Sequence, residues 1–217
     1  MGRLIVIEGL DGAGKATQAA LLTKALAKEG RQVLSVSFPN YDSESSALVK
    51  MYLAGAFGQR PDDVNAYAAS TFYAVDRYAS YKQQWQNFYQ NGGTVVADRY
   101  TTSNAVHQCS KLPKEQWDEY LDWLFDLEYR RIGIPAPDRV VFLELPLKVS
   151  QRLLAERYHG DENKKDIHER NLSYLEHSHQ AACYCAEKLG WVRLDCTRQG
   201  DLLPVEQIAQ MVFKAVE

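Results

Sequence analysis

The segment GLDGAGKAT, from Gly9 to Thr17, has the glycines and the lysine of a phosphate-binding loop at the required spacing. Gly9, Gly14 and Lys15 are in register with the pattern G-x-x-x-x-G-K-[ST], but Ala16 stands where the pattern requires a hydroxyl. Glycines let the backbone approach phosphate oxygens closely, so that amide N–H groups can donate to them. Lys15 would place its ammonium group at the β- and γ-phosphates. The segment therefore predicts a nucleotide site.

The alanine at position 16 bears on how this site would hold Mg²⁺. It removes the hydroxyl that ordinarily binds the metal in such loops. Thr17 cannot replace that hydroxyl, because the next residue on a helix is turned by about 100°. Asp98 ends the apolar segment TVVAD, where a parallel sheet places functional groups, and Asp11 lies inside the loop. We expect Asp98 and Asp11 to serve the metal, with a cap or turn role as the alternative for Asp98.

Three arginines could neutralise phosphate charge. Arg99 follows the strand TVVAD directly and could bind a phosphate through two hydrogen bonds. The alternative is that Arg99 forms an ion pair at the surface, as many arginines do. Arg152 and Arg157 precede the charged segment YHGDENKKD. Cations on a closing loop can stabilise a transferring phosphoryl group, whereas a charged segment is also commonly a solvated surface. We expect a lid over about residues 152–168.

A long helical pattern over residues 62–90 contains a pair of residues suited to a nucleobase. Apolar residues at helical spacing are expected to face the core, namely Val64, Ala68, Phe72, Val75 and Ala79. Tyr73 and Arg77 are four apart and share a different face. An aromatic ring and an arginine on one face can stack on a base and hydrogen-bond to it. A solvated helix face is consistent with the same spacing.

The order of these elements is that of a parallel α/β domain. Strands are expected at residues 4–8, 33–38, 94–98, 139–145 and 191–195. Helices are expected at residues 15–30, 62–90, 113–131 and 204–216, and a further helix is expected to begin at Asp166, where D-x-x-E resembles a capping box. No linker divides the chain, so we expect one domain over residues 1–217. The predicted fold is a doubly wound five-stranded parallel sheet with helices on both faces.

Composition narrows the class of protein. The chain has 217 residues and a formal net charge of -3, which argues against a surface that binds nucleic acid. Its four cysteines follow no disulfide or metal pattern and are expected to be reduced. The sequence shows no signal peptide and no stretch long enough to span a bilayer. We expect a cytoplasmic protein with neither nucleic acid nor membrane as a partner.

Six motifs in this order resemble those of the thymidylate kinase family: IEGLDGAGKATQ, SFPNY, FYAVDRY, DRYTTSNAVHQ, FLELP and KKDIHE. The resemblance covers nearly the whole chain. It implies the P-loop nucleoside monophosphate kinase fold with a lid. It also implies transfer of a phosphoryl group from MgATP to dTMP, giving dTDP and ADP for dTTP synthesis, in a homodimer.

The resemblance assigns roles around ATP. Arg99 resembles the arginine that bridges donor and acceptor phosphates, and Asp98 resembles the metal-side acid. Asp11 resembles the loop carboxylate that contacts the sugar 3′-hydroxyl or the magnesium shell. The expected catalytic residues are Lys15, Arg99, Arg157 and Asp11. The expected ATP contacts are Gly9, Leu10, Asp11, Gly12, Ala13, Gly14, Lys15, Ala16, Thr17 and Arg152.

The resemblance also assigns a site for dTMP. Tyr73 falls where the family stacks an aromatic ring on thymine, with Phe72 as the alternative, and Arg77 resembles the arginine bonded to the base. Ser103 and Asn104 fall at positions that contact the pyrimidine edge. The expected dTMP contacts are Asp11, Phe38, Pro39, Tyr41, Phe72, Tyr73, Arg77, Arg99, Ser103, Asn104 and His107.

Several positions depart from the family pattern. His107 lies where an aromatic residue often crowds the ribose 2′ position, so discrimination between sugars is left open. The segment reads FPNY where many members have an arginine after FP, and Tyr41 is the expected phosphate contact. Gly12 stands where the eukaryotic type carries an arginine. The bacterial type takes its catalytic arginine from the lid, which points to Arg157 and secondarily to Arg152.

Two other functions fit part of this pattern. A kinase of deoxynucleosides or of other nucleotides is one; a hydroxyl acceptor would need a base, for which Glu8 is a candidate. A non-catalytic ATP-binding protein would agree with Ala16 but has no need of lid arginines. A dTMP acceptor needs no base, because its second pKa of about 6 leaves the phosphate largely dianionic at pH 7.

Overall fold

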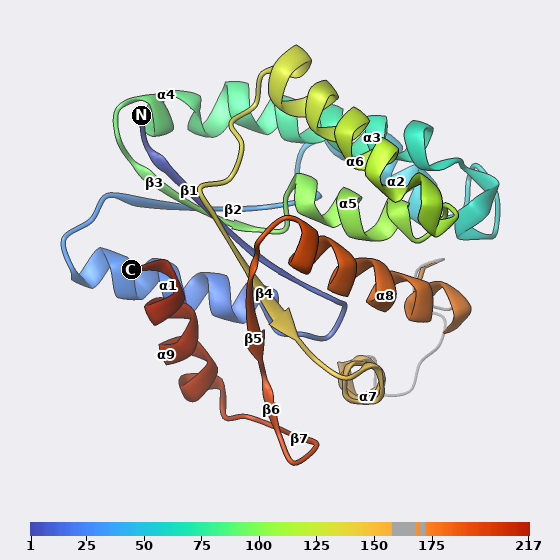
Figure 1. The fold of residues 1–217 in the computed structure, drawn as a ribbon. Helices are drawn as coiled ribbons and strands as arrows, with labels where there is room; N and C mark the ends of the chain where they lie inside the picture. The colour runs from blue at the N-terminus through green and yellow to red at the C-terminus, as the bar shows by residue number, and fades with distance from the viewer. Residues whose placement is uncertain (158–167, 170–171) are drawn as a thin grey trace.

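A five-stranded parallel sheet lies at the centre of the computed structural model, which describes residues 1–157, 168–169 and 172–217 (Figure 1). The strand order is β2-β3-β1-β4-β5. The strands are β1 (Arg3–Gly9), β2 (Val33–Ser37), β3 (Thr94–Asp98), β4 (Arg139–Glu144) and β5 (Val192–Asp195). The fold class and the five strands expected from the sequence are confirmed.

Helices surround this sheet in the described part of the chain. They are α1 (Lys15–Lys28), α2 (Ala47–Leu53), α3 (Ala66–Ser80), α4 (Gln86–Gln90), α5 (Thr101–Cys109), α6 (Trp117–Phe125), α7 (Leu147–Arg157), α8 (Leu172–Lys188) and α9 (Val205–Val216). π-Helical turns at Tyr81–Trp85 and Asp126–Ile132 follow α3 and α6 without a break. Short 3-10 turns occur at Glu44–Ser46, Pro61–Asp63 and Lys114–Gln116.

The central strand β1 contributes to two separate cores because successive side chains point to opposite faces of a sheet. Leu4 and Val6 belong to the core on one face, and Ile5 and Ile7 belong to the core on the other. All four are fully buried. Strand β1 pairs in parallel with both β3 and β4, and both of its faces are buried. Its sequence is therefore a continuous apolar run rather than an alternation of apolar and polar residues.

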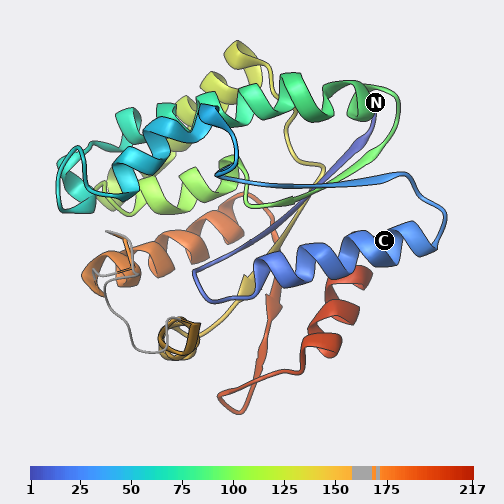
Figure 2. The same cartoon turned by 180° about the vertical axis from the view of Figure 1, so that it is seen from behind.

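The helices divide between these two faces. Figures 1 and 2 show α3 to α6 on one side of the sheet and α1 with α9 on the other. The first core contains residues of α3, α5, α6 and α8, and the second contains residues of α1, α7 and α9. The helix after β1 and the helix after β3 therefore leave the sheet toward opposite faces. In an open parallel sheet this arrangement forms a crevice at the carboxyl ends of the two strands.

The long helix expected at residues 62–90 is present but begins at Ala66, where the Asn65 side chain accepts a hydrogen bond from the Ala68 amide at 2.9 Å. The apolar stripe expected to be its core face is confirmed only in part, since Val64 is buried and Phe72 packs against the same small core cluster. Val75 is 53% exposed, whereas Ala69 and Ser70 are fully buried. Ala69 packs in the cluster that contains Tyr52 of α2, and Ser70 is hydrogen-bonded to Asn104 of α5, so packing here follows side-chain size rather than hydropathy.

Several elements have no counterpart in the sequence expectations, among them helices α5 and α7. Helix α2 lies in a segment for which no element was expected. Strands β6 (Thr197–Arg198) and β7 (Asp201–Leu202) form a small antiparallel hairpin after β5, where no element was expected. Along the described residues, no helix combines the length and apolar character needed to cross a membrane.

Candidate active site

The loop between β1 and α1 has the backbone of a phosphate cradle. Gly12 and Gly14 adopt left-handed conformations, with φ of 83° and 78°. A Cβ at Gly12 would lie 2.9 Å from the Ser150 carbonyl oxygen, so only glycine fits beneath α7. No side chain caps the N-terminus of α1, which leaves its first N–H groups for an anion. Ala16 and Thr17 are exposed on this first turn.

Lys15 is buried against the loop, and its Nζ donates to the Leu10 carbonyl oxygen at 2.8 Å. Burial and the positive charge of Arg99 lower the pKa of Lys15 to about 8. Neighbouring carboxylates, that of Asp11 first, oppose this shift. The lysine is therefore mostly protonated at pH 7 and loses its charge within the mildly alkaline range.

We expect kcat/KM for ATP to fall as the pH rises through about 8, because neutral Lys15 cannot attract phosphate oxygens. Initial rates between pH 6 and 10 at saturating acceptor would measure this limb. Lys15→Arg stays charged over the whole range, so its alkaline limb should flatten even if its rate is lower. Burial also lowers the pKa of Lys111 to about 8, and Lys111→Met should leave the limb in place. An unchanged limb in Lys15→Arg would contradict the assignment.

Arg99 connects the loop to the start of α5. Its guanidinium forms an ion pair with Asp11, lies 3.7 Å from the Glu8 carboxylate and donates to the Ser103 hydroxyl at 3.2 Å. It also lies 3.4 Å from the Nε2 atom of His107. Arg99 is not glycine but has a φ of 66°, a backbone conformation that costs about 1–3 kcal/mol and is found mainly at functional sites. Residues expected on the ATP side and on the dTMP side thus meet at this arginine.

The charged side chains around Arg99 form a cluster and shift one another's pKa values. Burial opposes ionisation of Asp11, but Arg99 and Lys15 outweigh it and hold the pKa of Asp11 well below its usual range. Burial lowers the pKa of His107 to about 4, and Arg99 adds to the effect. Asp11 is consequently ionised and His107 neutral at pH 7.

Glu8 is a central residue of this cluster. From the sequence, it was considered only as the base of a kinase with a hydroxyl acceptor. Its buried carboxylate accepts hydrogen bonds from the Thr102 hydroxyl at 2.7 Å, the Ser103 hydroxyl at 2.8 Å and the Gly9 amide at 3.0 Å. An acidic residue at the carboxyl end of a strand is the same signal that singled out Asp98. The carboxylate fixes the start of α5 beside the loop.

Asp98 has a carboxylate oxygen that could bind a cation. Its Oδ1 atom is buried and has no hydrogen-bond partner among the described residues. Burial raises the pKa of Asp98, and Lys15 opposes this. Within the described ranges, no three His, Cys, Asp or Glu side chains are grouped to hold a metal by themselves. Mg²⁺ is commonly bound by one or two carboxylates together with substrate phosphates and water, and a single orphaned carboxylate oxygen fits that mode.

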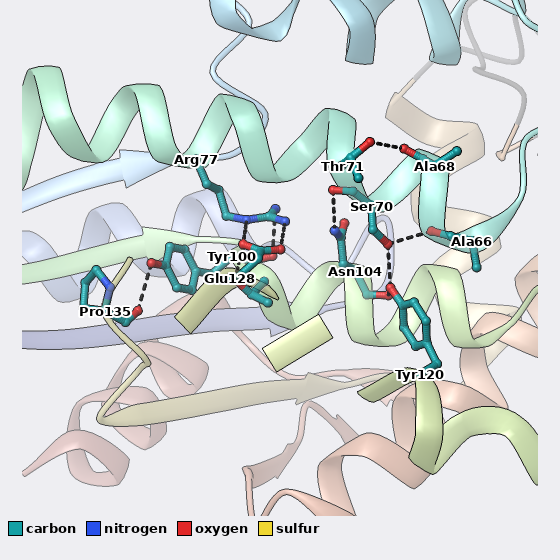
Figure 3. Close-up of polar contacts among 11 residues, drawn as sticks. Ala66, Ala68, Ser70, Thr71, Arg77, Tyr100, Asn104, Tyr120, Glu128 and Pro135 are labelled. Atoms are coloured by element: carbon teal, nitrogen blue, oxygen red, sulfur yellow. Dashed lines mark hydrogen bonds and ion pairs between the residues drawn. The ribbon is translucent and has the colours of Figure 1, made fainter. Parts of the chain in front are cut away.

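The residues expected around the base lie beneath and beside α3, as Figure 3 shows in part. The Asn104 amide donates to the Ser70 carbonyl oxygen at 3.2 Å. Tyr73 and Phe72 are half-buried, and both rings contact the ring of Tyr52, with centroids 6.5 and 6.3 Å away. Tyr52 is a buried neighbour that the sequence did not single out, because α2 was not expected.

Arg77 is placed differently from the sequence alternatives. It is 1% exposed, so the solvated helix face is wrong. Its Nε and Nη2 atoms donate to the two oxygens of Glu128 at 2.7 and 2.5 Å, and its Nη1 donates to the Tyr100 carbonyl oxygen at 3.4 Å (Figure 3). Burial disfavours its charge, but Glu128 outweighs this and raises the pKa of Arg77.

The segment after β2 divides between core and surface. Phe38 is buried against Tyr100, with ring centroids 5.8 Å apart, Pro39 is partly exposed and Tyr41 is exposed. Asp76 of α3 holds this segment by accepting a hydrogen bond from the Asn40 amide at 2.8 Å. The segment that contains Tyr41 is thereby tied to the helix that carries Tyr73 and Arg77.

Of the expected lid, residues 152–157 and 168 lie in the described part of the chain. Arg152 is exposed on α7. Arg157 is the last residue of α7, and its side chain lies outside the described part. His168 is buried, stacks on Tyr174 with a centroid distance of 4.6 Å, and lies 6.0 Å from the ring of His107. The end of the expected lid therefore contacts the α5 residue expected at the sugar.

This phosphate-binding loop, at the crevice of a β2-β3-β1-β4-β5 sheet, gives the chain the fold of the P-loop nucleoside monophosphate kinases. Comparison with known proteins identifies one family with this fold. The family model described as thymidylate kinase matches residues 7–206. The chain belongs to the thymidylate kinase family, enzymes that phosphorylate dTMP to dTDP with ATP.

Individual relatives agree with this family. The thymidylate kinase of Mycobacterium tuberculosis (strain CDC 1551 / Oshkosh) is 35% identical over 158 residues, which are 72% of this chain and 71% of the relative. That of Synechococcus sp. (strain RCC307) is 29% identical over 216 residues, 97% of this chain and 93% of the relative. The solved structure of thymidylate kinase from Candida albicans has the same fold, with a TM-score of 0.73 and 22% identity, covering 99% of this chain and 91% of that one.

Proposed function

We propose that this chain transfers the γ-phosphoryl group of MgATP to the phosphate of dTMP by neutralising charge with Lys15, Arg99 and Arg157. The observation that carries the proposal is the position of Arg99. Its guanidinium contacts Asp11 in the phosphate-binding loop and Ser103 at the start of α5. A cation at that junction can bond to donor and acceptor phosphates together.

The acceptor needs no general base. A dTMP phosphate has a second pKa of about 6 and is a nucleophile at pH 7. Glu8, the candidate base of the alternative function, already accepts hydrogen bonds from Thr102, Ser103 and Gly9, which suits a structural anchor better than a base. Positioning and charge neutralisation would then supply the catalysis.

The residues that would bind Mg²⁺ are Asp98 and Asp11. The orphaned Oδ1 of Asp98 supports a direct or water-mediated contact. Bound there with ATP, the metal would neutralise charge on the β- and γ-phosphates. The exposed Ala16 would play no part in holding it.

The base would lie against Tyr73, with Phe72 as its neighbour and with Arg77 and Asn104 at its polar edge. An arginine offers five N–H donors, and three of those on Arg77 have partners. The remaining donors suit a carbonyl oxygen of thymine. The lid of residues 152–168 would close over the phosphates and bring Arg157 to them.

A homodimer is also proposed, from the apolar side chains exposed on α2 and α3. They are Leu48, Met51, Val75 and Tyr78. Exposed apolar helix faces of this kind are candidates for burial against a second copy. Four unpaired cysteines agree with a reducing, cytoplasmic location.

The test is release of ADP from MgATP with dTMP, dUMP, dCMP, dGMP, UMP and thymidine as separate acceptors. We expect strong turnover with dTMP and little with thymidine. Turnover with thymidine instead would indicate a nucleoside kinase with Glu8 as its base. ATP binding without turnover on any acceptor would indicate a site for binding alone.

A further inference from the structure

The buried carboxylate of Glu128 holds the arginine that is proposed to read the base. Glu128 is completely buried, and both of its oxygens accept hydrogen bonds from Arg77 along one edge of the guanidinium (Figure 3). Two parallel hydrogen bonds fix the plane of the guanidinium as well as its position. Glu128 lies outside all of the quoted motifs.

Glu128 is itself held firmly. It lies in the π-helical turn Asp126–Ile132, and its carbonyl oxygen accepts from the amides of Gly133 at 3.0 Å and Ile134 at 3.1 Å. Its Oε2 atom also accepts from the Thr101 hydroxyl at 2.8 Å. The carboxylate therefore links α3, α5 and the turn after α6, and Arg77 has little freedom to move.

The same helical segment supports the other residue proposed at the base. The Tyr120 hydroxyl of α6 lies 2.7 Å from the Ser70 hydroxyl and donates to the Asn104 carbonyl oxygen at 3.4 Å. Ser70 in turn accepts from the Asn104 amide through its carbonyl oxygen. In Figure 3 these contacts and those of Glu128 lie along the same side of α3. The segment from Trp117 to Ile132 thus supports both side chains from behind.

We propose that Glu128 is a positioning residue that sets the preference of the enzyme for a pyrimidine monophosphate with a carbonyl oxygen at position 4. With one edge bound to Glu128 and Nη1 bound to Tyr100, Arg77 presents its remaining N–H donors in one fixed orientation. Thymine offers an acceptor at position 4, whereas cytosine offers a donor there. Because the Arg77 guanidinium cannot turn away, its N–H donor would face the amino group of cytosine, which is also a donor. A fixed polar group gives specificity by such a mismatch. The inference rests on the proposed dTMP site.

Glu128→Gln and Glu128→Asp test this. Glutamine keeps the shape but loses the charge, and aspartate keeps the charge but is shorter by one methylene. We expect Glu128→Gln to raise KM for dTMP by about tenfold or more and to lower the preference for dTMP over dCMP by a similar factor. Its kcat with dTMP should stay within about threefold, and KM for ATP should not change. Glu128→Asp should fall between Glu128→Gln and the unmodified enzyme.

Asp126→Asn is the matched control, because it removes a partly exposed carboxylate from the same turn. It should leave all of these constants unchanged. If Glu128→Gln does not fold, Glu128→Asp decides the question, since it leaves no unpaired cation in the core. A folded Glu128 variant with the unmodified KM and base preference would overturn the proposal.

A double-mutant cycle separates this inference from the proposed function. If Glu128 acts through Arg77, then Arg77→Ala together with Glu128→Gln should have the KM of Arg77→Ala alone, whereas independent effects would multiply. Arg77→Ala without any effect would remove Arg77 from the base site and so contradict the proposed function. A large effect of Arg77→Ala with none from Glu128→Gln would overturn only the role of Glu128.

Discussion

Replacing Arg99 with alanine is expected to lower kcat for dTMP by about 10³-fold while changing KM for ATP by less than about threefold. The guanidinium lies between Asp11 and Ser103, so its loss removes positive charge from the junction of donor and acceptor. Charge neutralisation that is strongest in the transition state affects turnover rather than ground-state binding. Single-turnover rates with saturating MgATP and dTMP would measure the effect directly.

Arg99→Lys is the control for charge alone. Lysine keeps the cation but cannot form two parallel hydrogen bonds, so we expect it to recover only part of the rate. Thermal unfolding of each variant would show whether the fold survives, because the substitution leaves Asp11 and Glu8 without their cation. A folded Arg99→Ala enzyme that keeps kcat within about tenfold of the original would exclude a direct role.

Arg157→Ala is expected to lower kcat by about 10²–10³-fold with little change in KM for ATP. The physical reason lies in how α7 is anchored. The Ser150 hydroxyl donates to the Asp11 carbonyl oxygen at 2.5 Å, and the same helix packs over Gly12. Helix α7 is therefore anchored to the phosphate-binding loop, and Arg157, its last residue, belongs to the proposed lid.

Arg152→Ala gives the comparison, since it removes an exposed cation from the same helix five residues earlier. Its effect on kcat should be no more than about tenfold. Steady-state kinetics with both substrates varied would separate the two arginines. An effect of Arg157→Ala confined to KM, or a larger effect from Arg152→Ala, would contradict the assignment of the lid cation to Arg157.

The sequence predicted the sheet well because buried parallel strands have a local signature. Segments such as RLIVIEG and TVVAD are short apolar runs followed by glycine or acidic residues, and each forms a strand at the centre of the sheet. Glycines at fixed spacing similarly predicted the turn into α1, where Gly12 and Gly14 have positive φ. Both signals depend on neighbours within a few residues.

What the sequence could not predict depends on contacts between distant segments. The spacing of Tyr73 and Arg77 left a base site and a solvated face equally open, because Glu128, the partner that buries Arg77, is 51 residues away. Val75 was expected to be buried on hydropathy alone, yet it is 53% exposed while the smaller Ala69 and Ser70 are buried. Glu8 was weighed only as a base, since its partners Thr102 and Ser103 come from another strand–helix junction.

The buried ion pair between Arg77 and Glu128 also restricts how this sequence can change over generations. Losing either partner alone leaves an uncompensated charge in the core, at a cost of about 3–5 kcal/mol. That is a large share of the roughly 5–15 kcal/mol that stabilises a typical domain. Exchanging both residues together for apolar ones can be nearly neutral. We therefore expect the two positions to evolve as a pair, so that a lineage with a different acceptor base is reached through coupled substitutions rather than a single step.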